Sequence, residues 1–184
     1  SEKKNLIADI EAELNDKRAY AASRMIRSMC AGDSFALSLR GEKADVEAIT
    51  AQSLYDHYRK VLETSPVELF FVGSADAQEV AKELMPLATA LAARPMTLPA
   101  QTGLNLTAEE REFYETMDLN QGKLSMGFTT PITNQHPDFA AMQVFNAVYG
   151  AGMTSKLFMN VREKLSLCYY AGSGYYGSKG IVTV

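Results

Sequence analysis

Apolar side chains recur at helical spacing through the first part of the chain. Their repeat of three or four positions predicts one long amphipathic helix over residues 3–31, with Gly32 at its end. A second helix is expected after Thr50, which can cap it, and before the break at Ser65-Pro66. The apolar stripe of this second helix consists of Leu54, Tyr55, Tyr58, Val61 and Leu62.

The patterning then changes from helical to extended. Residues 67–72 form an almost unbroken run of β-favouring side chains, which is typical of a strand covered on both faces. Asp76 and Glu79 match a capping box that opens a third helix, and Pro86 is expected to end or kink it. With a loop expected at residues 41–46, the first half is predicted as helix, helix, strand and helix.

Residues 94–109 have no clear periodicity and contain two prolines and a glycine. Such a composition is typical of a linker or a long connection. After it, residues 111–119 and 123–130 alternate well enough to predict two paired strands around a turn at 120–122.

The last third of the chain predicts two helices followed by two strands. Pro137 suits the first turn of a helix that Gly150 closes, and Thr154 or Ser155 can cap another that runs through Leu165. Strands are expected at residues 167–173 and 181–184, around a turn rich in glycine and tyrosine. The mixture predicts an α+β fold with an antiparallel or mixed sheet, and not a doubly wound parallel sheet.

Composition restricts the partners and the compartment. The 184 residues are 47% hydrophobic, enough for a sizeable core, and the net charge of −4 is spread without a basic stripe. Nucleic acid, acidic substrates and anionic membranes are therefore disfavoured partners, and no apolar run approaches the roughly 20 residues that cross a bilayer. Cys30 and Cys168 lie on segments predicted to be buried, so reduced thiols and a cytoplasmic location are expected. Both ends of the chain are expected to be cut, since it starts inside a helical pattern and stops on a strand-like run.

The residues themselves indicate no catalytic centre. His57 and His136 are far apart in sequence, and neither has a second His or Cys at a metal-ligand spacing. Solvated or capping roles are expected for both. The segment 150–152 follows a helix and not a strand, and it lacks the lysine of a P-loop. It is therefore interpreted as a helix end and not as a phosphate-binding loop.

One stretch resembles a known family closely. Residues 149–169 contain a glycine-rich turn, then Ser155-Lys156-Leu157-Phe158, an Arg-Glu-Lys and a tyrosine, and this series is similar to a signature of the insulinase/pitrilysin zinc metallopeptidases. The strand-like residues 127–131 and the helix-like residues 138–149 fit the same family. The stretches 54–58 and 68–76 are similar to the end of a preceding homologous domain. The resemblance covers most of the chain and is strongest over residues 122–170.

The resemblance implies a domain organisation and a cofactor. Members of the family consist of repeated α+β domains, so the chain is expected to hold parts of two successive metallopeptidase-like sandwich domains. Their predicted bounds are residues 1–93 and 111–184, joined by a linker at 94–110. The family binds zinc through a His-x-x-Glu-His motif and a later glutamate, and this chain lacks the motif. Zinc is therefore expected in the parent protein and none in this chain.

The resemblance also implies two substrate-binding residues, Arg162 and Tyr169. They are similar to a pair that reaches the zinc site and binds the scissile carbonyl or the substrate backbone. A guanidinium and a phenol can both donate hydrogen bonds to developing negative charge. The pair is expected to lie within about 5 Å on one face, because helix-to-strand connections are short. That face is expected to be exposed to a groove and not buried in the core. Two departures from the family pattern bear on this expectation: Lys156 replaces an arginine, and Ser166 stands where the family has glycine.

A purely structural interpretation of the pair stays open. An arginine in the last turn of a helix offsets the helix dipole, and a tyrosine on a strand packs well. Tyr170 is a neighbouring candidate for the role of Tyr169, although it is expected on the other face of the strand.

The functional hypotheses follow from the resemblance. In the first, the chain is part of a zinc metalloendopeptidase that acts on peptides, and it contributes scaffold and substrate binding but not the zinc site. The alternative is an inactive peptidase-like subunit that binds peptides or partners an active protease, as in mitochondrial processing peptidase. A plain interaction module is the third. The expected partners are a peptide substrate, the remaining domains of the parent chain and a homologous peptidase subunit.

Overall fold

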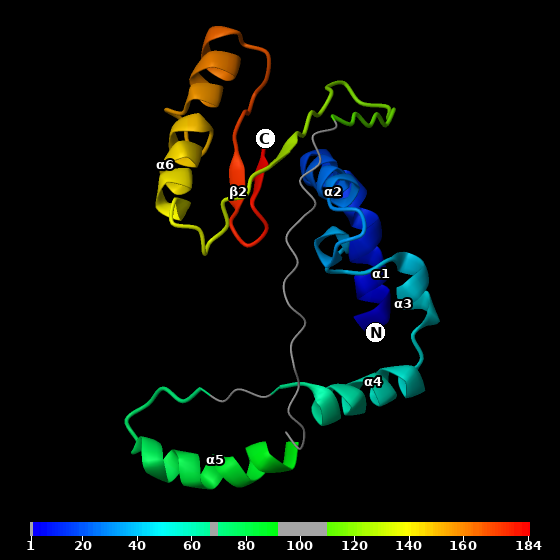
Figure 1. The fold of residues 1–184 in the computed structure, drawn as a ribbon. Coiled ribbons are helices and arrows are strands. Elements are labelled where there is room, and N and C mark those ends of the chain that lie inside the picture. Colours follow the sequence, from blue (N-terminus) through cyan, green and yellow to red (C-terminus); the bar gives the residue numbers. More distant parts are fainter. Residues whose placement is uncertain (1, 67–69, 92–109) are drawn as a thin grey trace. The chain divides into compact units, whose positions relative to one another are not determined.

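The structure, a computed structural model, describes residues 2–66, 70–91 and 110–184. The chain divides into two compact units, residues 1–43 with 102–184, and residues 44–101. Within the described residues, helices combine with a small antiparallel sheet, which confirms the α+β class (Figure 1). The expected linker at 94–109 and residues 67–69 of the expected strand lie outside the described residues. The predicted domain bounds therefore stay a prediction.

The first unit begins with two helices where one was predicted. Helix α1 spans Glu2–Ala12, a 3₁₀ turn η1 spans Glu13–Asn15, and helix α2 spans Lys17–Met29. The single helix over residues 3–31 is wrong because the Asp16 carboxylate accepts hydrogen bonds from the N–H groups of Arg18 and Ala19, at 3.1 and 3.0 Å. An aspartate that caps in this way starts a new helix at that point.

The sheet lies at the centre of the first unit. Its strands are β1 (Gly127–Thr129), β2 (Gly174–Tyr176) and β3 (Ile181–Thr183), in the order β1-β3-β2, and both pairings are antiparallel. Ile181 and Val182 of the central strand are buried. Helix α2 packs against β1, where a Cβ on Gly127 would collide with the sulfurs of Met25 and Met29.

The structure corrects three of the predicted strands. Residues 111–119 form no strand, and of residues 123–130 only Gly127–Thr129 does, paired with β3 and not with an upstream hairpin partner. Residues 167–173 form no strand either, because the pairing with β3 starts at Gly174. The predicted last strand is confirmed as β3. Alternation along the chain identifies β-favouring residues, but a strand also needs a neighbour to accept and donate its hydrogen bonds.

The two predicted helices of the last third are confirmed in position. Helix α6 spans Phe139–Tyr149 and ends at Gly150. The next helix, η3, is a π-helix over Phe158–Lys164, and the Ser155 hydroxyl accepts a hydrogen bond from the Phe158 N–H at 3.3 Å. The coil before β2 is fastened to α6, because the Ser173 hydroxyl donates to the Asn146 side chain at 2.7 Å and the Ser173 N–H donates to the Gly150 carbonyl.

The hairpin between β2 and β3 is fixed at its tip. Gly180 has a φ of 65°, and a Cβ there would collide with the backbone carbonyl of Thr130. The Thr130 N–H donates to the Gly180 carbonyl at 2.8 Å, so the two backbones are in direct contact. Only glycine fits such a position.

An ion pair joins the same hairpin to the segment after α2. Lys179 Nζ lies 2.9 Å from Asp33 Oδ2, with side chains that are only 15% and 12% exposed. Phe35 packs edge-on against Tyr176 of β2, with ring centroids 5.6 Å apart. Hydrogen bonds from Lys179 and from the Phe35 N–H lower the pKa of Asp33. The sheet is thereby linked to residues that precede it by most of the chain.

The second unit is helical over its described residues. Helix α3 (Lys43–Ala48) occupies most of the predicted loop at 41–46, which corrects that prediction. Helix α4 (Ala51–Thr64) starts at a capping box of Thr50 and Ser53, as the sequence predicts for Thr50, and stops before Ser65. Helix α5 (Ala77–Leu91) starts at Asp76, whose carboxylate accepts from two N–H groups, and it continues through Pro86. Of the two effects predicted for Pro86, an end or a kink, the end does not occur.

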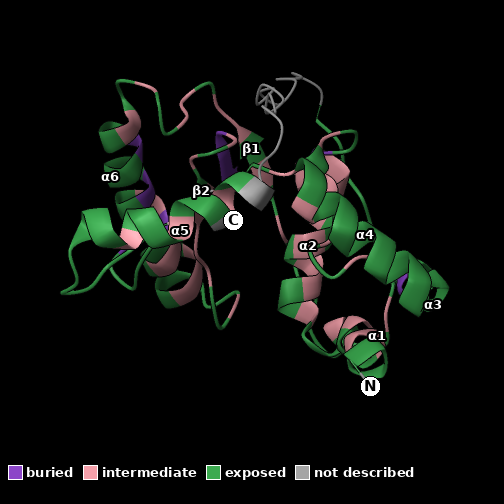
Figure 2. Cartoon of the chain, turned by 90° about the horizontal axis from the view of Figure 1, so that it is seen from below, coloured by how far each residue is buried: buried purple, intermediate pink, exposed green. Residues whose placement is uncertain are grey.

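The predicted apolar stripe of α4 is exposed within its unit. Leu54, Tyr55 and Tyr58 are all more than half exposed, and Figure 2 colours almost all of α4 as exposed. Residues 70–72, the described part of the expected strand, are not in a strand. Amphipathic spacing thus predicted the helix correctly but not the burial of its apolar face. No described helix has the length and apolar character needed to span a membrane.

Substitution of Ser166 tests the turn after η3. Ser166 has a φ of 51°, a left-handed conformation that costs an L-residue free energy and costs glycine almost none. We expect Ser166→Gly to raise the free energy of unfolding by about 1 kcal/mol, measured by urea denaturation. Ser166→Ala is the matched control, because it removes the hydroxyl and keeps the strained backbone. A gain in Ser166→Ala equal to that in Ser166→Gly would contradict the explanation.

The ion pair of Asp33 and Lys179 predicts a dependence of stability on pH. Because the pKa of Asp33 is lowered by folding, its contribution is present above the unfolded-state value near 3.9 and is lost as the pH falls through the folded value. We expect Asp33→Asn to destabilise the protein by about 1–2 kcal/mol at neutral pH, with the difference shrinking below about pH 4. Urea denaturation of both proteins over a pH series measures this. A difference that stays constant down to the acid limit would contradict it.

Candidate functional site

The candidate site is formed where η3 ends and the chain reverses. The Ser166 N–H donates to the Arg162 carbonyl at 3.0 Å, and the Leu167 N–H donates to the Val161 carbonyl at 3.1 Å. With Ser166 in its left-handed conformation, these bonds turn the backbone so that residue 169 runs back beside the helix. The position of Ser166 is thus one that glycine would favour, and the turn forms in spite of the serine.

Arg162 and Tyr169, the two predicted site residues, are joined at this turn. Arg162 Nε donates a hydrogen bond to the backbone carbonyl of Tyr169 at 2.9 Å. The contact involves the backbone of Tyr169 and not its phenol. The predicted approach of the two side chains to within 5 Å therefore stays a prediction.

The guanidinium of Arg162 has two further contacts. Nη1 donates to the carboxylate of Glu163, and the Cζ atom lies 4.7 Å from the centroid of the Phe158 ring. The side chain is nevertheless 41% exposed. Nη2 has no hydrogen-bond partner among the described residues, so its N–H groups are available.

The two tyrosines at this turn differ in their surroundings. Tyr169 is 85% exposed, and its phenol has no hydrogen-bond partner in the described part of the chain. The ring of Tyr170 lies under the guanidinium of Arg18, with Cζ 3.9 Å from the ring centroid. Tyr170 therefore contributes a cation–π contact to the packing of α2, whereas Tyr169 is available to a ligand.

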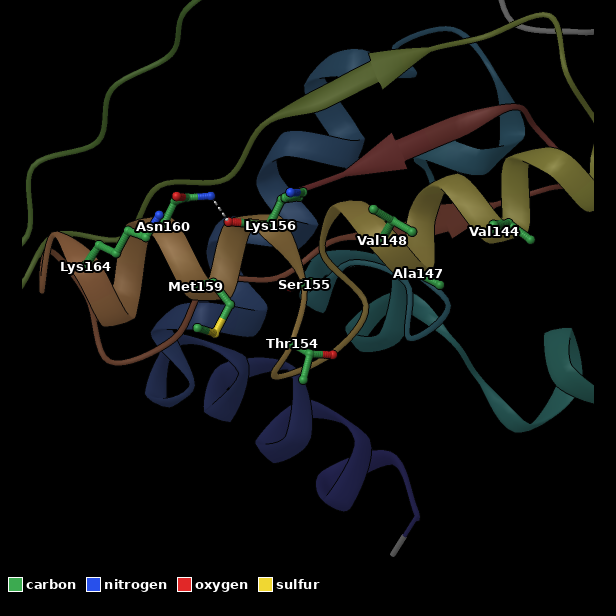
Figure 3. Close-up of a pocket in the computed structure, with 9 residues that line it drawn as sticks. All are labelled: Val144, Ala147, Val148, Thr154, Ser155, Lys156, Met159, Asn160 and Lys164. Atoms are coloured by element: carbon green, nitrogen blue, oxygen red, sulfur yellow. Dashed lines mark hydrogen bonds between the residues drawn. The ribbon is translucent and has the colours of Figure 1, made fainter.

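A groove of about 540 Å³ lies nearby, between α6 and η3 (Figure 3). Its walls include the apolar side chains of Val144, Val148 and Met159, and Lys156 and Lys164 add positive charge. Neither Arg162 nor Tyr169 lines this groove. The expectation that the pair faces a groove is therefore not met by this hollow.

The histidines and cysteines give no metal centre. His57 is exposed on α4, and His136 Nδ1 accepts a hydrogen bond from the Asp138 N–H at 3.1 Å at the start of α6. Cys30 is buried and Cys168 half-buried, and both thiols are free. Burial raises the pKa of the Cys30 thiol. Over the described ranges, no three His, Cys, Asp or Glu side chains are grouped closely enough to hold a metal ion, so these residues do not fit zinc.

A comparison with protein families identifies the family of this chain. The sequence model of the family described as "Peptidase M16 inactive domain" matches residues 48–184. The chain belongs to the peptidase M16 family. The resemblance to insulinase/pitrilysin proteases is thereby confirmed, and the matched range contains η3, Arg162 and Tyr169.

Curated relatives of this M16 chain include one protein named as a probable inactive metalloprotease and one named as an uncharacterized zinc protease. The chain is 36% identical over 183 residues to the "Probable inactive metalloprotease YmfF" of Bacillus subtilis (strain 168), a match that covers all of this chain and 43% of that protein. It is 39% identical over 70 residues to an "Uncharacterized zinc protease" of Rickettsia felis, across 36% of this chain and 17% of that protein. The chain thus spans less than half the length of these relatives.

Solved structures show the same fold. A conserved protein from Enterococcus faecalis V583 matches with a TM-score of 0.86 and 32% identity, over 99% of this chain and 43% of that one. A peptidase M16 inactive domain from Pseudomonas fluorescens matches with a TM-score of 0.67 and 19% identity, over 98% of this chain and 44% of that one. Because its sequence identity is low, the second match supports the fold alone.

Two residues of the candidate site were not predicted from the sequence. Phe158 and Glu163 both contact the Arg162 guanidinium, and neither was singled out. A signal for Phe158 was available, since it precedes Arg162 by one helical turn and side chains at that spacing face each other. Glu163 had no such signal, because adjacent residues on a regular α-helix point in different directions.

Zinc binding by the chain itself can be tested directly. We expect residues 1–184 to retain no stoichiometric zinc after dialysis and to cleave no peptide, because a zinc site needs three or four converging ligands. Metal content is measured by atomic absorption on the wild type and on the His57→Ala and His136→Ala variants, which should not differ. One equivalent of zinc that either variant loses would contradict this prediction.

Proposed function

We propose that this chain supplies scaffold and peptide-binding groups to an M16 peptidase-like protein and does not supply the zinc ligands. The observation that carries the proposal is the exposed turn after η3, where Arg162 Nη2 and the Tyr169 phenol are both available. The lack of a metal-ligand cluster over the described residues is consistent with it.

The chemistry of the two groups suits a peptide carbonyl. A guanidinium N–H and a phenolic O–H are both donors, and a carbonyl oxygen accepts two hydrogen bonds. Donors that are held in place before the ligand arrives stabilise negative charge on that oxygen with little rearrangement. Arg162 meets this condition because the Tyr169 carbonyl, Glu163 and the Phe158 ring hold its guanidinium in place.

The proposal has two versions that differ in the rest of the protein. In the first, the chain is part of an active zinc endopeptidase, and the remaining domains provide the metal. In the second, the chain belongs to an inactive subunit that presents peptides or joins a homologous, active protease. The name of the Bacillus subtilis relative, a probable inactive metalloprotease, favours the second version. The two free thiols support a cytoplasmic location for both versions.

Substitution of the two donors in the intact protein tests the proposal. If the protein cleaves peptides, we expect Arg162→Ala and Tyr169→Phe each to lower turnover by roughly 10²–10³, the usual effect of removing a donor to developing charge. If it does not cleave peptides, we expect both substitutions to weaken peptide binding, measured by fluorescence polarisation. Zinc-dependent cleavage by the wild type would distinguish the first version from the second.

Two control variants match the changes in chemistry. Tyr170→Phe removes a phenol from a ring that packs under Arg18, and Arg59→Ala removes an exposed arginine on α4 that pairs with Glu63. Neither control should change turnover or binding. Wild-type activity and affinity in both Arg162→Ala and Tyr169→Phe would leave the pair with a purely structural role.

A further inference from the structure

Two of the three nitrogen atoms of the Arg162 guanidinium are already engaged. Nε donates to the Tyr169 carbonyl at 2.9 Å, and Nη1 donates to the Glu163 carboxylate. Glu163 therefore offsets the positive charge at the point where the guanidinium meets solvent. The two side chains are 41% and 44% exposed, so a ligand can reach the pair.

This arrangement decides which ligand oxygen Arg162 can bind. Arginine binds a carboxylate most strongly through two parallel N–H groups, on the edge formed by Nη1 and Nη2 or on the edge formed by Nε and Nη2. The Nε–Nη2 edge of Arg162 has lost one of its two donors, because the one N–H of Nε is bound to the Tyr169 carbonyl. On the Nη1–Nη2 edge, the Glu163 carboxylate already lies at Nη1 and competes with a carboxylate of the ligand. The N–H groups of Nη2 have no such partner among the described residues, and each of them suits the one oxygen atom of a neutral carbonyl.

The charge of Glu163 acts in the same direction. A carboxylate on the ligand would be repelled by the Glu163 carboxylate at nearly the same point at which Arg162 attracts it. A backbone carbonyl carries no net charge and meets no such repulsion. Glu163 thus favours ligands that present a neutral backbone carbonyl over ligands that carry a carboxylate.

We propose that Glu163 is a specificity-determining residue. It holds the Arg162 guanidinium in a position to bind a neutral peptide carbonyl, and it disfavours acidic side chains of the ligand next to that guanidinium. The inference rests on the proposed function, since it assigns a substrate preference to the same site. Phe158 supports the arrangement, because its ring lies against the guanidinium and limits the positions that the guanidinium can take. Glu163 thus positions the Arg162 guanidinium and also repels acidic groups of the ligand by its own charge.

The test uses the intact protein and two fluorescein-labelled peptides of equal length, acetylated and amidated at their ends. The peptides differ only at the central positions, which carry Gln in the neutral peptide and Glu in the acidic peptide. Fluorescence polarisation gives the affinity ratio of the neutral to the acidic peptide for each variant. We expect Glu163→Gln to lower this ratio about fivefold, the size of effect that an exposed ion pair produces. Glu163→Asp, which keeps the charge, should retain most of the preference.

Two controls separate this effect from a general change of charge. Glu115→Gln removes an equivalent exposed acid that pairs with Arg24 at 2.7 Å, and it should leave the ratio unchanged. The double variant Arg162→Ala/Glu163→Gln should show a lower ratio than Arg162→Ala alone, because the Glu163 carboxylate repels an acidic ligand whether or not the guanidinium is present. Thermal unfolding of each variant checks that the fold is retained, as expected for exposed pairs that contribute little to stability.

The outcomes distinguish this inference from the proposed function. If Arg162→Ala weakens peptide binding but Glu163→Gln leaves the ratio unchanged, the preference assigned to Glu163 is wrong and the proposed function stands. An equal change in Glu115→Gln would also overturn it, because the effect would then come from net charge. If neither peptide binds, or Arg162→Ala has wild-type affinity for both, the proposed function and the inference fail together.

Discussion

The buried strand β3 is the element on which the rest of the first unit depends. It is hydrogen-bonded on both sides, to β1 and to β2, and its residues Ile181 and Val182 are buried. Through β2 and the bonds of Ser173 to Asn146 and Gly150, it holds helix α6, which precedes η3 and the turn of Arg162. Three residues of pairing near the end of the chain thus place a site that lies well before them.

Prediction from the sequence succeeded where the signal was local. Thr50 and Asp76 cap helices as expected, because a cap involves only the next three residues. Asp16 uses the same chemistry, but it lies inside an apolar repeat that continues on both sides, so the periodicity concealed it. The strands at 111–119 and 167–173 failed for a different reason, because their expected partners pair elsewhere or not at all among the described residues.

The candidate site was predictable only in part. Arg162 and Tyr169 came from a resemblance and not from the chemistry of the residues, since an isolated arginine and tyrosine carry no distinctive spacing. The structure adds the contacts that fix the position of the Arg162 guanidinium, above all the hydrogen bond to the carboxylate of Glu163. The shape of the turn also depends on the left-handed φ of Ser166, which the residue type does not predict. The glycine that the family has at this position was the available signal.

The contact at Gly180 has a consequence for sequence variation. A side chain there would meet the Thr130 carbonyl, and backbone atoms cannot move aside as a flexible side chain can. Every missense change at this position therefore pushes the start of β3 away from the end of β1. Gly180 should tolerate no replacement in a genetic screen, whereas Gly152, whose absent Cβ would meet nothing within 4 Å, should accept many. At these two glycines, mutational tolerance is set by the distance from the missing Cβ to the nearest backbone.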